Sequence, residues 1–197
     1  MLPKLDFSDG IPPDRRTMCV VPTIITGLQT LNDMLGAMEV RYLANRDSNL
    51  FWALLTDFRD ALEEVMPEDG EILRIARDGI DGLNAKYTTG NAGPFFLFHS
   101  PRRWNTQEGV WMGWERKRGK LADLNALLRG TADGRFLLVD GATAELSNVQ
   151  HVITLDTDTQ LPRDAARQLV GTMAHPLNHP VFDAAREIVT AGYSILQ

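Results

Sequence analysis

Cysteine is almost absent from this chain of 197 residues. The one thiol, Cys19, lies in an apolar run and has no second cysteine for an intrachain bridge, so a disulfide scaffold is excluded and a reducing compartment is indicated. Apolar runs of about 18 residues, the length of a membrane-spanning helix, are missing as well. The N-terminus lacks the apolar core of a signal peptide. We therefore expect a soluble chain without a transmembrane segment.

Excess positive charge is also missing. The chain has 20 Lys and Arg against 26 Asp and Glu, for a net charge of −6, and no basic stripe, so nucleic acid is not an expected partner. Hydrophobic residues make up 44% and charged residues 23%, which is typical of a globular protein. We expect a polar leader over residues 1–16 and one folded body, whole or in part, over 17–197.

Apolar patterns predict strands that alternate with helices. Short continuous apolar runs, typical of strands buried on both faces, occur at 18–21, 50–55, 95–98 and 149–155. Three- and four-residue periodicity predicts helices over 28–42, 72–83, 120–129 and 162–174. A turn at 90–94, a long loop at 99–119 and a last strand at 189–196 complete the pattern. The alternation predicts an α/β fold with a mostly parallel sheet flanked by helices.

Acidic residues stand where two of these strands end. Pro22 has no N–H to donate and is expected to end the first strand. Asp57 and Asp156 follow later strands, and ligands of parallel sheets bind beyond such carboxyl ends. Asp156 and Asp158 are one residue apart, so their carboxylates could hold Mg²⁺ or Mn²⁺ and neutralise a diphosphate leaving group. From the tripeptide alone, the alternative that both aspartates are solvated turn residues and not metal ligands stays open.

Basic and aromatic residues gather in the stretch before the third helix. The cluster 116–120 could meet phosphate oxygens at the helix N-terminus, or it could be a solvated basic loop. Trp104, Trp111 and Trp114 lie just upstream, and their rings could stack on sugars or pin the loop to the core. Prolines follow both His175 and His179, so a helical metal site at this pair is not expected.

Two other motifs are similar to parts of this region. The stretch 113–121 is one residue too long for a P-loop and has Leu121 in place of the hydroxyl residue, so it is rejected. The stretch 156–159 is similar to the nucleophile motif of haloacid-dehalogenase-type phosphatases. That pattern requires another residue at Gln160 and further motifs well downstream. It stays as an alternative in which Asp156 is the nucleophile.

Several segments together resemble a known family. The segments 20–23, 54–57, 118–125 and 152–158 come in the order used by processive, cellulose-synthase-like glycosyltransferases. Four longer segments resemble the glycosyltransferase domain of bacterial cyclic β-1,2-glucan synthase, namely 39–46, 102–105, 108–120 and 154–163. This second resemblance covers nearly the whole chain.

The resemblance implies a fold and an activity. It implies the glycosyltransferase A fold, UDP-glucose as donor, a glucan acceptor, and inverting transfer that builds β-1,2-linked glucan. By the same resemblance, Pro22 and Thr23 would border the nucleotide pocket and Asp57 would face the uridine part. Lys120 would approach the diphosphate, and the two aspartates of the 156–158 motif would hold Mg²⁺ or Mn²⁺ on it.

The chain also departs from the family pattern. The catalytic base and the [QR]-x-x-R-W motif of such enzymes follow the metal-binding aspartates at a distance, so both are expected beyond Gln197. The similar residues 102–104 stand upstream of the aspartates and are not that motif. The resemblance thus implies an incomplete, donor-side segment of a larger protein on the cytoplasmic side of the inner membrane, inactive by itself. An exposed sheet edge would favour self-association. A non-catalytic nucleotide- or sugar-binding module is the other interpretation.

Overall fold

The computed structural model describes residues 2–88, 92–131 and 134–197. The central sheet is built from β1 (Thr17–Ile25), β2 (Leu50–Phe58), β3 (Phe95–His99), β6 (Leu138–Asp140) and β7 (His151–Thr154). The helices are α1 (Leu28–Ala44), α2 (Asp69–Tyr87), α3 (Arg116–Leu128) and α4 (Ala165–Ala174). Two separate ribbons pair β4 (Arg102–Asn105) with β5 (Val110–Gly113) and β8 (Val181–Asp183) with β9 (Ile188–Ala191).

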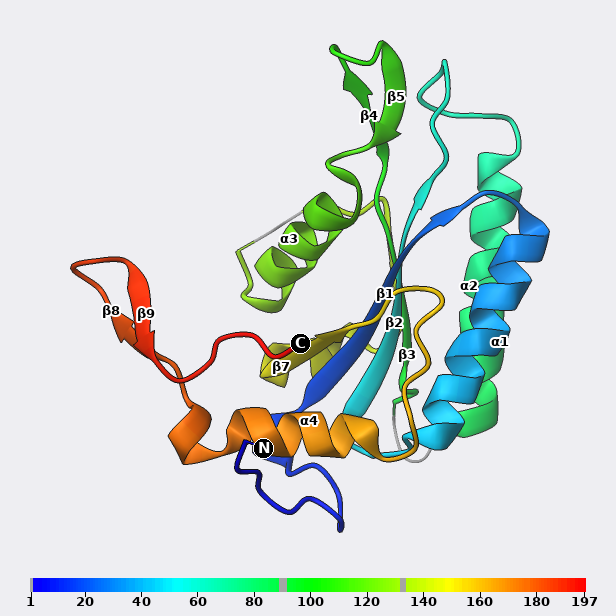
Figure 1. Ribbon diagram of the computed structural model, residues 1–197. Coiled ribbons are helices and arrows are strands. Elements are labelled where there is room, and N and C mark those ends of the chain that lie inside the picture. Colours follow the sequence, from blue (N-terminus) through cyan, green and yellow to red (C-terminus); the bar gives the residue numbers. More distant parts are fainter. Residues whose placement is uncertain (1, 89–91, 132–133) are drawn as a thin grey trace.

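The strand order of the central sheet is β6-β3-β2-β1-β7 (Figure 1). The four strands β1, β2, β3 and β7 are parallel, and only β6 runs antiparallel, against β3. The predicted α/β fold with a mostly parallel sheet is therefore confirmed. The edge strand β6 was not predicted because it has only three residues, all of them half-buried, and so carries no long apolar run.

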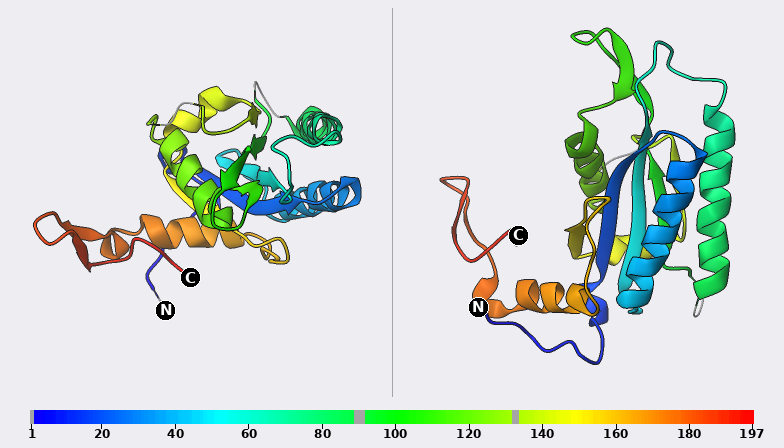
Figure 2. Two further views of the ribbon diagram at one scale, coloured as in Figure 1. Left: turned by 90° about the horizontal axis from the view of Figure 1, so that it is seen from above. Right: turned by 45° about the vertical axis from the view of Figure 1, so that its right-hand side comes forward.

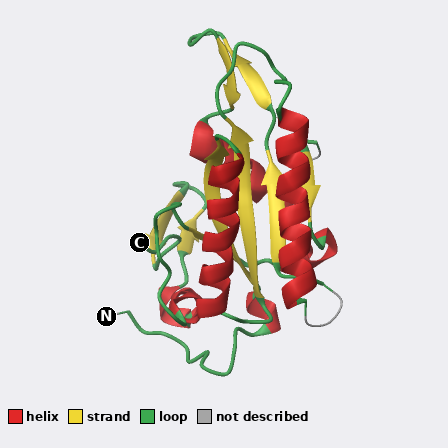
Figure 3. Ribbon diagram, turned by 90° about the vertical axis from the view of Figure 1, so that its right-hand side faces the viewer, coloured by secondary structure: helices red, strands yellow, loops and turns green. Residues whose placement is uncertain are grey.

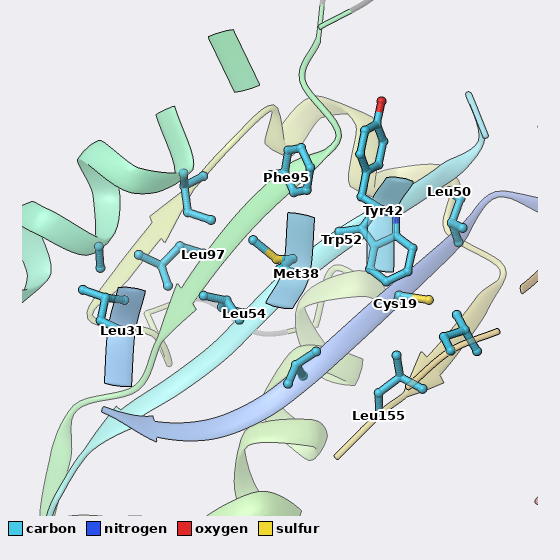
Figure 4. Close-up of a cluster of buried hydrophobic side chains, with 14 of the residues drawn as sticks. Cys19, Leu31, Met38, Tyr42, Leu50, Trp52, Leu54, Phe95, Leu97 and Leu155 are labelled. Carbon is cyan, nitrogen blue, oxygen red and sulfur yellow. The ribbon is translucent and has the colours of Figure 1, made fainter. Parts of the chain in front are cut away.

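Helices cover both faces of the sheet. The pair α1 and α2 lies on one face and α3 on the other, while α4 crosses below the sheet (Figures 2 and 3). The side chains of Trp52 and Phe95 pack with Met38 and Tyr42 of α1 in the first core (Figure 4). Phe96 and its neighbours pack under α3 in the second. Since successive strand residues face opposite cores, the central strands are apolar at nearly every position.

The first strand runs past Pro22, which corrects the prediction that it ends there. In β1 every residue from Thr17 to Ile25 pairs with β2, but pairing with β7 stops at Val20. The backbone N of Leu155 donates to the carbonyl of Val20, so the even positions face β7. The missing N–H of Pro22 therefore faces the side where β7 has ended, and no ladder bond is lost.

The stretch 99–119 is not a loop, which corrects a second prediction. It contains the β4–β5 hairpin and the first turn of α3, which begins at Arg116 rather than at residue 120. The side chain of Asn105 accepts from two backbone N–H groups of the connecting turn, and Gly109 has φ +67° there. Strands of four residues with polar members leave little periodicity to find.

Other boundaries also differ from the expectations. Helix α4 begins at Ala165 instead of residue 162, and the last strand is shorter, lying in the β8–β9 ribbon and not in the sheet. In the leader, Ile11 is only 2% exposed and belongs to the core. The predicted turn at 90–94 lies partly outside the described residues.

Apolar side chains stand exposed on the β8–β9 ribbon, including Phe182 at 61% exposure. Self-association of the chain stays a prediction. Within the described parts of the chain, none of the helices has both the length and the apolar character needed to cross a bilayer.

Candidate functional site

A buried ion pair links β2 to α3. Asp57 lies near the end of the pairing between β1 and β2, opposite Ile24, and is fully buried. The Lys120 ammonium donates to Oδ1 of Asp57 at 2.5 Å and to the carbonyl of Thr23 at 2.8 Å. Burial raises the pKa of Asp57 and lowers the pKa of Lys120, and each charge opposes the other's shift. Three of the predicted site residues thus meet in one contact.

The second oxygen of this carboxylate differs from the first in its hydrogen bonding. Oδ2 of Asp57 is buried and has no hydrogen-bond partner among the described residues. A Cβ on Gly113 would lie 1.8 Å from it, so only glycine lets the hairpin approach so closely. A buried carboxylate oxygen without a donor is costly, which makes it a place where a donor from a ligand or a water molecule is expected.

The first aspartate of the 156–158 motif also pairs with α3. Asp156 follows β7, and its Oδ1 accepts from the Lys117 ammonium at 2.5 Å. Lys117 stands three residues before Lys120, on the same side of the helix. Asp156 and Asp57 therefore bind lysines that are one turn apart on α3. This agrees with the prediction that both aspartates stand at the carboxyl ends of parallel strands.

The backbone of the 156–158 motif is held by α1. The guanidinium of Arg41, which is 2% exposed, donates to the carbonyls of Thr157 and Thr159 at 2.6 and 3.0 Å. Burial lowers the pKa of Arg41, while the nearby charge of Asp158 opposes this. The carboxylate of Asp158 itself is exposed to solvent.

One turn further on, Asn45 binds the end of the same loop. Its Nδ2 donates to the carbonyl of Leu161, and its Oδ1 accepts from the N–H of Ala166 in the first turn of α4. Sequence reasoning missed both Arg41 and Asn45. The available signal was two polar residues four apart beside the apolar face of a helix, inside a segment already noted for its resemblance.

The rest of the basic cluster also meets carboxylates. Arg116 binds both oxygens of Asp60 at 2.6 and 2.7 Å, and Arg118 binds Glu115. Glu115 and Arg116 have left-handed backbones, with φ of 47° and 55°. A Cβ on Gly119 would lie 2.0 Å from the carbonyl of Trp114. A strained, tightly packed turn therefore fixes where α3 begins and which acidic group each basic side chain reaches.

The three tryptophans have different surroundings. Trp104 and Trp111 face each other across the hairpin with ring centroids 5.9 Å apart. The backbone of Trp111 exchanges two 2.9 Å hydrogen bonds with Ala61, which ties the hairpin to the segment after β2. Trp104 and Trp114 are 47% and 52% exposed. The hairpin is pinned through Trp111, while a sugar contact by the exposed rings stays a prediction.

A second buried ion pair holds the base of the hairpin. Arg102 binds Asp69 of α2 and the carbonyl of Arg59, and its guanidinium lies 4.6 Å from the centroid of the Phe58 ring. His99 packs edge-on against Phe58 and shares a 2.8 Å hydrogen bond with a neighbouring threonine. Burial lowers the pKa of His99 to about 3.

Two cavities lie away from the Asp57–Lys120 pair. One of about 210 Å³ is lined by Phe58, Arg102 and the N-terminus of α1. Because Asp57 and Phe58 are consecutive in a strand, they face opposite sides of the sheet. The other, of about 500 Å³, lies between the leader and α4. The candidate site is therefore on the α3 face, at the rim of the sheet.

The 156–158 motif offers few protein ligands for a metal ion. Among the described residues, no group of three or more His, Cys, Asp and Glu side chains is placed to hold an ion. Asp156 and Asp158 offer two carboxylates, and Asp156 already binds a cation in the form of the Lys117 ammonium. Mg²⁺ is commonly bound through one or two carboxylates plus substrate phosphates. An ion held by Asp156 and Asp158 and completed by a diphosphate stays a prediction.

The catalytic base is not assigned to any of these residues. Gln197, beyond which the resemblance places the base, is exposed and lies outside the described helices and strands. An amide side chain is neutral and takes up no proton near neutral pH, so Gln197 is itself no candidate for that role. A base beyond Gln197 stays a prediction, and so does the binding of a donor at the Asp57–Lys120 pair and Asp156.

Comparison with known proteins confirms the resemblance. The chain is 46% identical over 192 residues, or 98% of its length, to the cyclic β-(1,2)-glucan synthase NdvB of Rhizobium meliloti (strain 1021). The match covers 7% of that relative, so the chain spans a small segment of its length. No family model matches the chain.

Proposed function

We propose that this chain is the donor-binding segment of an inverting, metal-dependent glucosyltransferase that uses UDP-glucose to build cyclic β-1,2-glucan. The similarity to a curated glucan synthase over 98% of the chain supports this proposal. The structural observation that carries it is that Asp57 and Asp156, which stand at or just after the ends of β2 and β7, bind lysines one turn apart on α3. The glucan acceptor and the rest of a larger polypeptide, at the cytoplasmic side of the inner membrane, would be its partners.

Each residue has a defined task in this proposal. Pro22 and Thr23 border the nucleotide, and Asp57 faces the uridine part. The Lys120 ammonium opposes the rise in the pKa of Asp57 that burial causes, and it places positive charge near the diphosphate. Asp156 and Asp158 are the protein ligands of Mg²⁺ or Mn²⁺.

The bound cation would neutralise the charge that develops on UDP as it leaves. The exposed rings of Trp104 and Trp114 offer apolar faces to a sugar. Because Arg41 fixes the carbonyls of the 156–158 loop, the two carboxylates are presented from a set backbone.

Calorimetric titration with UDP, in the presence and absence of Mn²⁺, tests the proposal. UDP binding should depend on Mn²⁺ and should weaken by about tenfold or more in Asp158→Ala, because outer contacts of metal sites already contribute about that much. Asp33→Ala removes an exposed carboxylate of α1 and should bind as the unaltered chain does.

Two results would contradict the proposal. UDP binding that is independent of Mn²⁺ and unchanged in Asp158→Ala would contradict the metal site. It would favour a non-catalytic nucleotide-binding module. Release of phosphate from a simple phosphomonoester, lost in Asp156→Asn, would favour the phosphatase alternative.

A further inference from the structure

The first two turns of α3 carry three cations, each paired with a carboxylate from a different part of the sheet rim. Arg116 binds Asp60, Lys117 binds Asp156, and Lys120 binds the buried carboxylate of β2. The α3 start is fixed by its left-handed residues and by close packing at Gly119. The helix therefore presents these cations at set positions along the rim.

The two lysine pairs differ sharply in burial. The side chains of Lys120 and Asp57 are 3% and 0% exposed, and the ammonium also donates to a backbone carbonyl. Separating such a pair leaves an uncompensated buried charge, so it is a permanent contact. The side chains of Lys117 and Asp156 are 48% and 63% exposed. Water can replace either partner, and such pairs contribute little.

The weak pair sits on a carboxylate that the proposed function gives to a metal. A divalent cation at Asp156 would place two positive charges beside an ammonium that binds the same carboxylate. Like charges repel at that range, and the ammonium is on a flexible four-carbon stem that can turn into water. Lys117 and a divalent cation therefore compete for Asp156.

We propose that Lys117 is a tethered counter-ion that occupies Asp156 in the metal-free protein and is displaced when a divalent cation binds. This inference rests on the proposed function, since it takes Asp156 as a metal ligand. It assigns Lys117 a task distinct from that of Lys120, although both belong to one basic cluster. Lys117 lowers the affinity for free metal and keeps the carboxylate neutralised until metal arrives.

Binding of Mn²⁺ alone, followed by electron paramagnetic resonance, tests this assignment. Lys117→Gln should bind Mn²⁺ roughly two- to fivefold more tightly, since an exposed pair contributes up to about 1 kcal/mol and ~1.4 kcal/mol is tenfold. Arg118→Gln is the matched control. It removes the same charge one residue along, from a side chain that is 82% exposed and paired with Glu115, and should change the affinity less than Lys117→Gln does.

The outcomes separate the two claims. Equal or weaker Mn²⁺ binding by Lys117→Gln, while the unaltered chain binds Mn²⁺, overturns the counter-ion and leaves the proposed function standing. An equal gain in Arg118→Gln also overturns it, because general electrostatics would then suffice. Failure of both the unaltered chain and Lys117→Gln to bind Mn²⁺ overturns the counter-ion, which requires binding of the free metal, whereas the metal site itself is judged by the Mn²⁺-dependent titration with UDP.

A second measurement needs no substitution in the protein that is titrated. Adding Mg²⁺ to the unaltered chain should shift the Cε resonance of Lys117, assigned by its absence from Lys117→Gln, while that of Lys120 moves little. A Lys117 resonance that stays in place at saturating Mg²⁺ overturns the proposal.

Discussion

At the scale of single residues, burial decides what each charge can do. Lys120 and Asp57 lie inside the protein and compensate each other, whereas Lys117 and Asp156 lie at its surface. The same residue types in the same helix turn therefore give one fixed anchor and one exchangeable contact. Sequence position predicted that the two aspartates would meet at the sheet rim. It could not predict which lysine would be buried, because that depends on how closely Gly113 lets the hairpin approach.

His99 gives a pH-dependent prediction at this scale. Its pKa is lowered from 6.5 to about 3, chiefly by burial. The imidazole takes up a proton near pH 6.5 in the unfolded chain but not in the folded chain. The contribution of neutral His99 to the free energy of unfolding is therefore complete above pH 6.5 and is lost as the pH falls toward 3. The unaltered chain should lose about 2 kcal/mol more unfolding free energy between pH 7 and pH 5 than His99→Gln, at about 1.4 kcal/mol per pH unit.

Urea unfolding at both pH values measures this difference. Carboxylates titrate in both proteins, so their effect cancels in the comparison. An equal change in unfolding free energy with pH in the two proteins would show that His99 takes up protons in the folded state. That result would contradict the burial of His99 at 0% exposure.

At the scale of elements, α1 does more than cover the sheet. Its apolar face was predictable from periodicity, and Leu31, Met38 and Tyr42 are buried as expected. The same helix sends Arg41 and Asn45 into the loop after β7. Those contacts span more than 110 residues of sequence, and no local pattern specifies them. Periodicity finds a helix face, but it does not say which distant loop that face will hold.

Replacing Arg41 should loosen this loop. Arg41→Met keeps the aliphatic stem and leaves the carbonyls of Thr157 and Thr159 without their donor, so we expect a loss of about 2 kcal/mol in unfolding free energy. Amide hydrogen exchange over 157–161 should accelerate, and Mn²⁺ affinity should fall because the carboxylates lose their set backbone.

Arg74→Met on α2 is the matched control. That side chain is 59% exposed and pairs only within its own helix, so its replacement should stay within about 0.5 kcal/mol. Unchanged exchange over 157–161 in Arg41→Met would show that the loop does not depend on the guanidinium.

At the scale of the whole molecule, one sheet is buried between two cores and one ribbon stands apart. The central strands β1 and β2 pair over nine residues, and their apolar runs are what made the sheet predictable. The β8–β9 ribbon was predicted only as a final strand of the sheet. An apolar run of a few residues suits a sheet or a ribbon equally, and only the tertiary structure decides between them.

The molecule should therefore unfold unevenly. Leu54 of β2 is 1% exposed in the core that α1 and α2 cover, so Leu54→Ala should cost about 2–5 kcal/mol of global unfolding free energy. Val189 of β9 is 41% exposed, so Val189→Asn should cost less than about 0.5 kcal/mol. Guanidinium unfolding followed by tryptophan fluorescence, to which buried Trp52 contributes, measures both variants. Native-state hydrogen exchange should show the ribbon amides opening well before those of β1 and β2, because few buried apolar contacts hold them. Equal costs for the two variants, or equal protection of ribbon and sheet, would mean that the ribbon is an integral part of the cooperative core and that its exposed side chains are covered in solution.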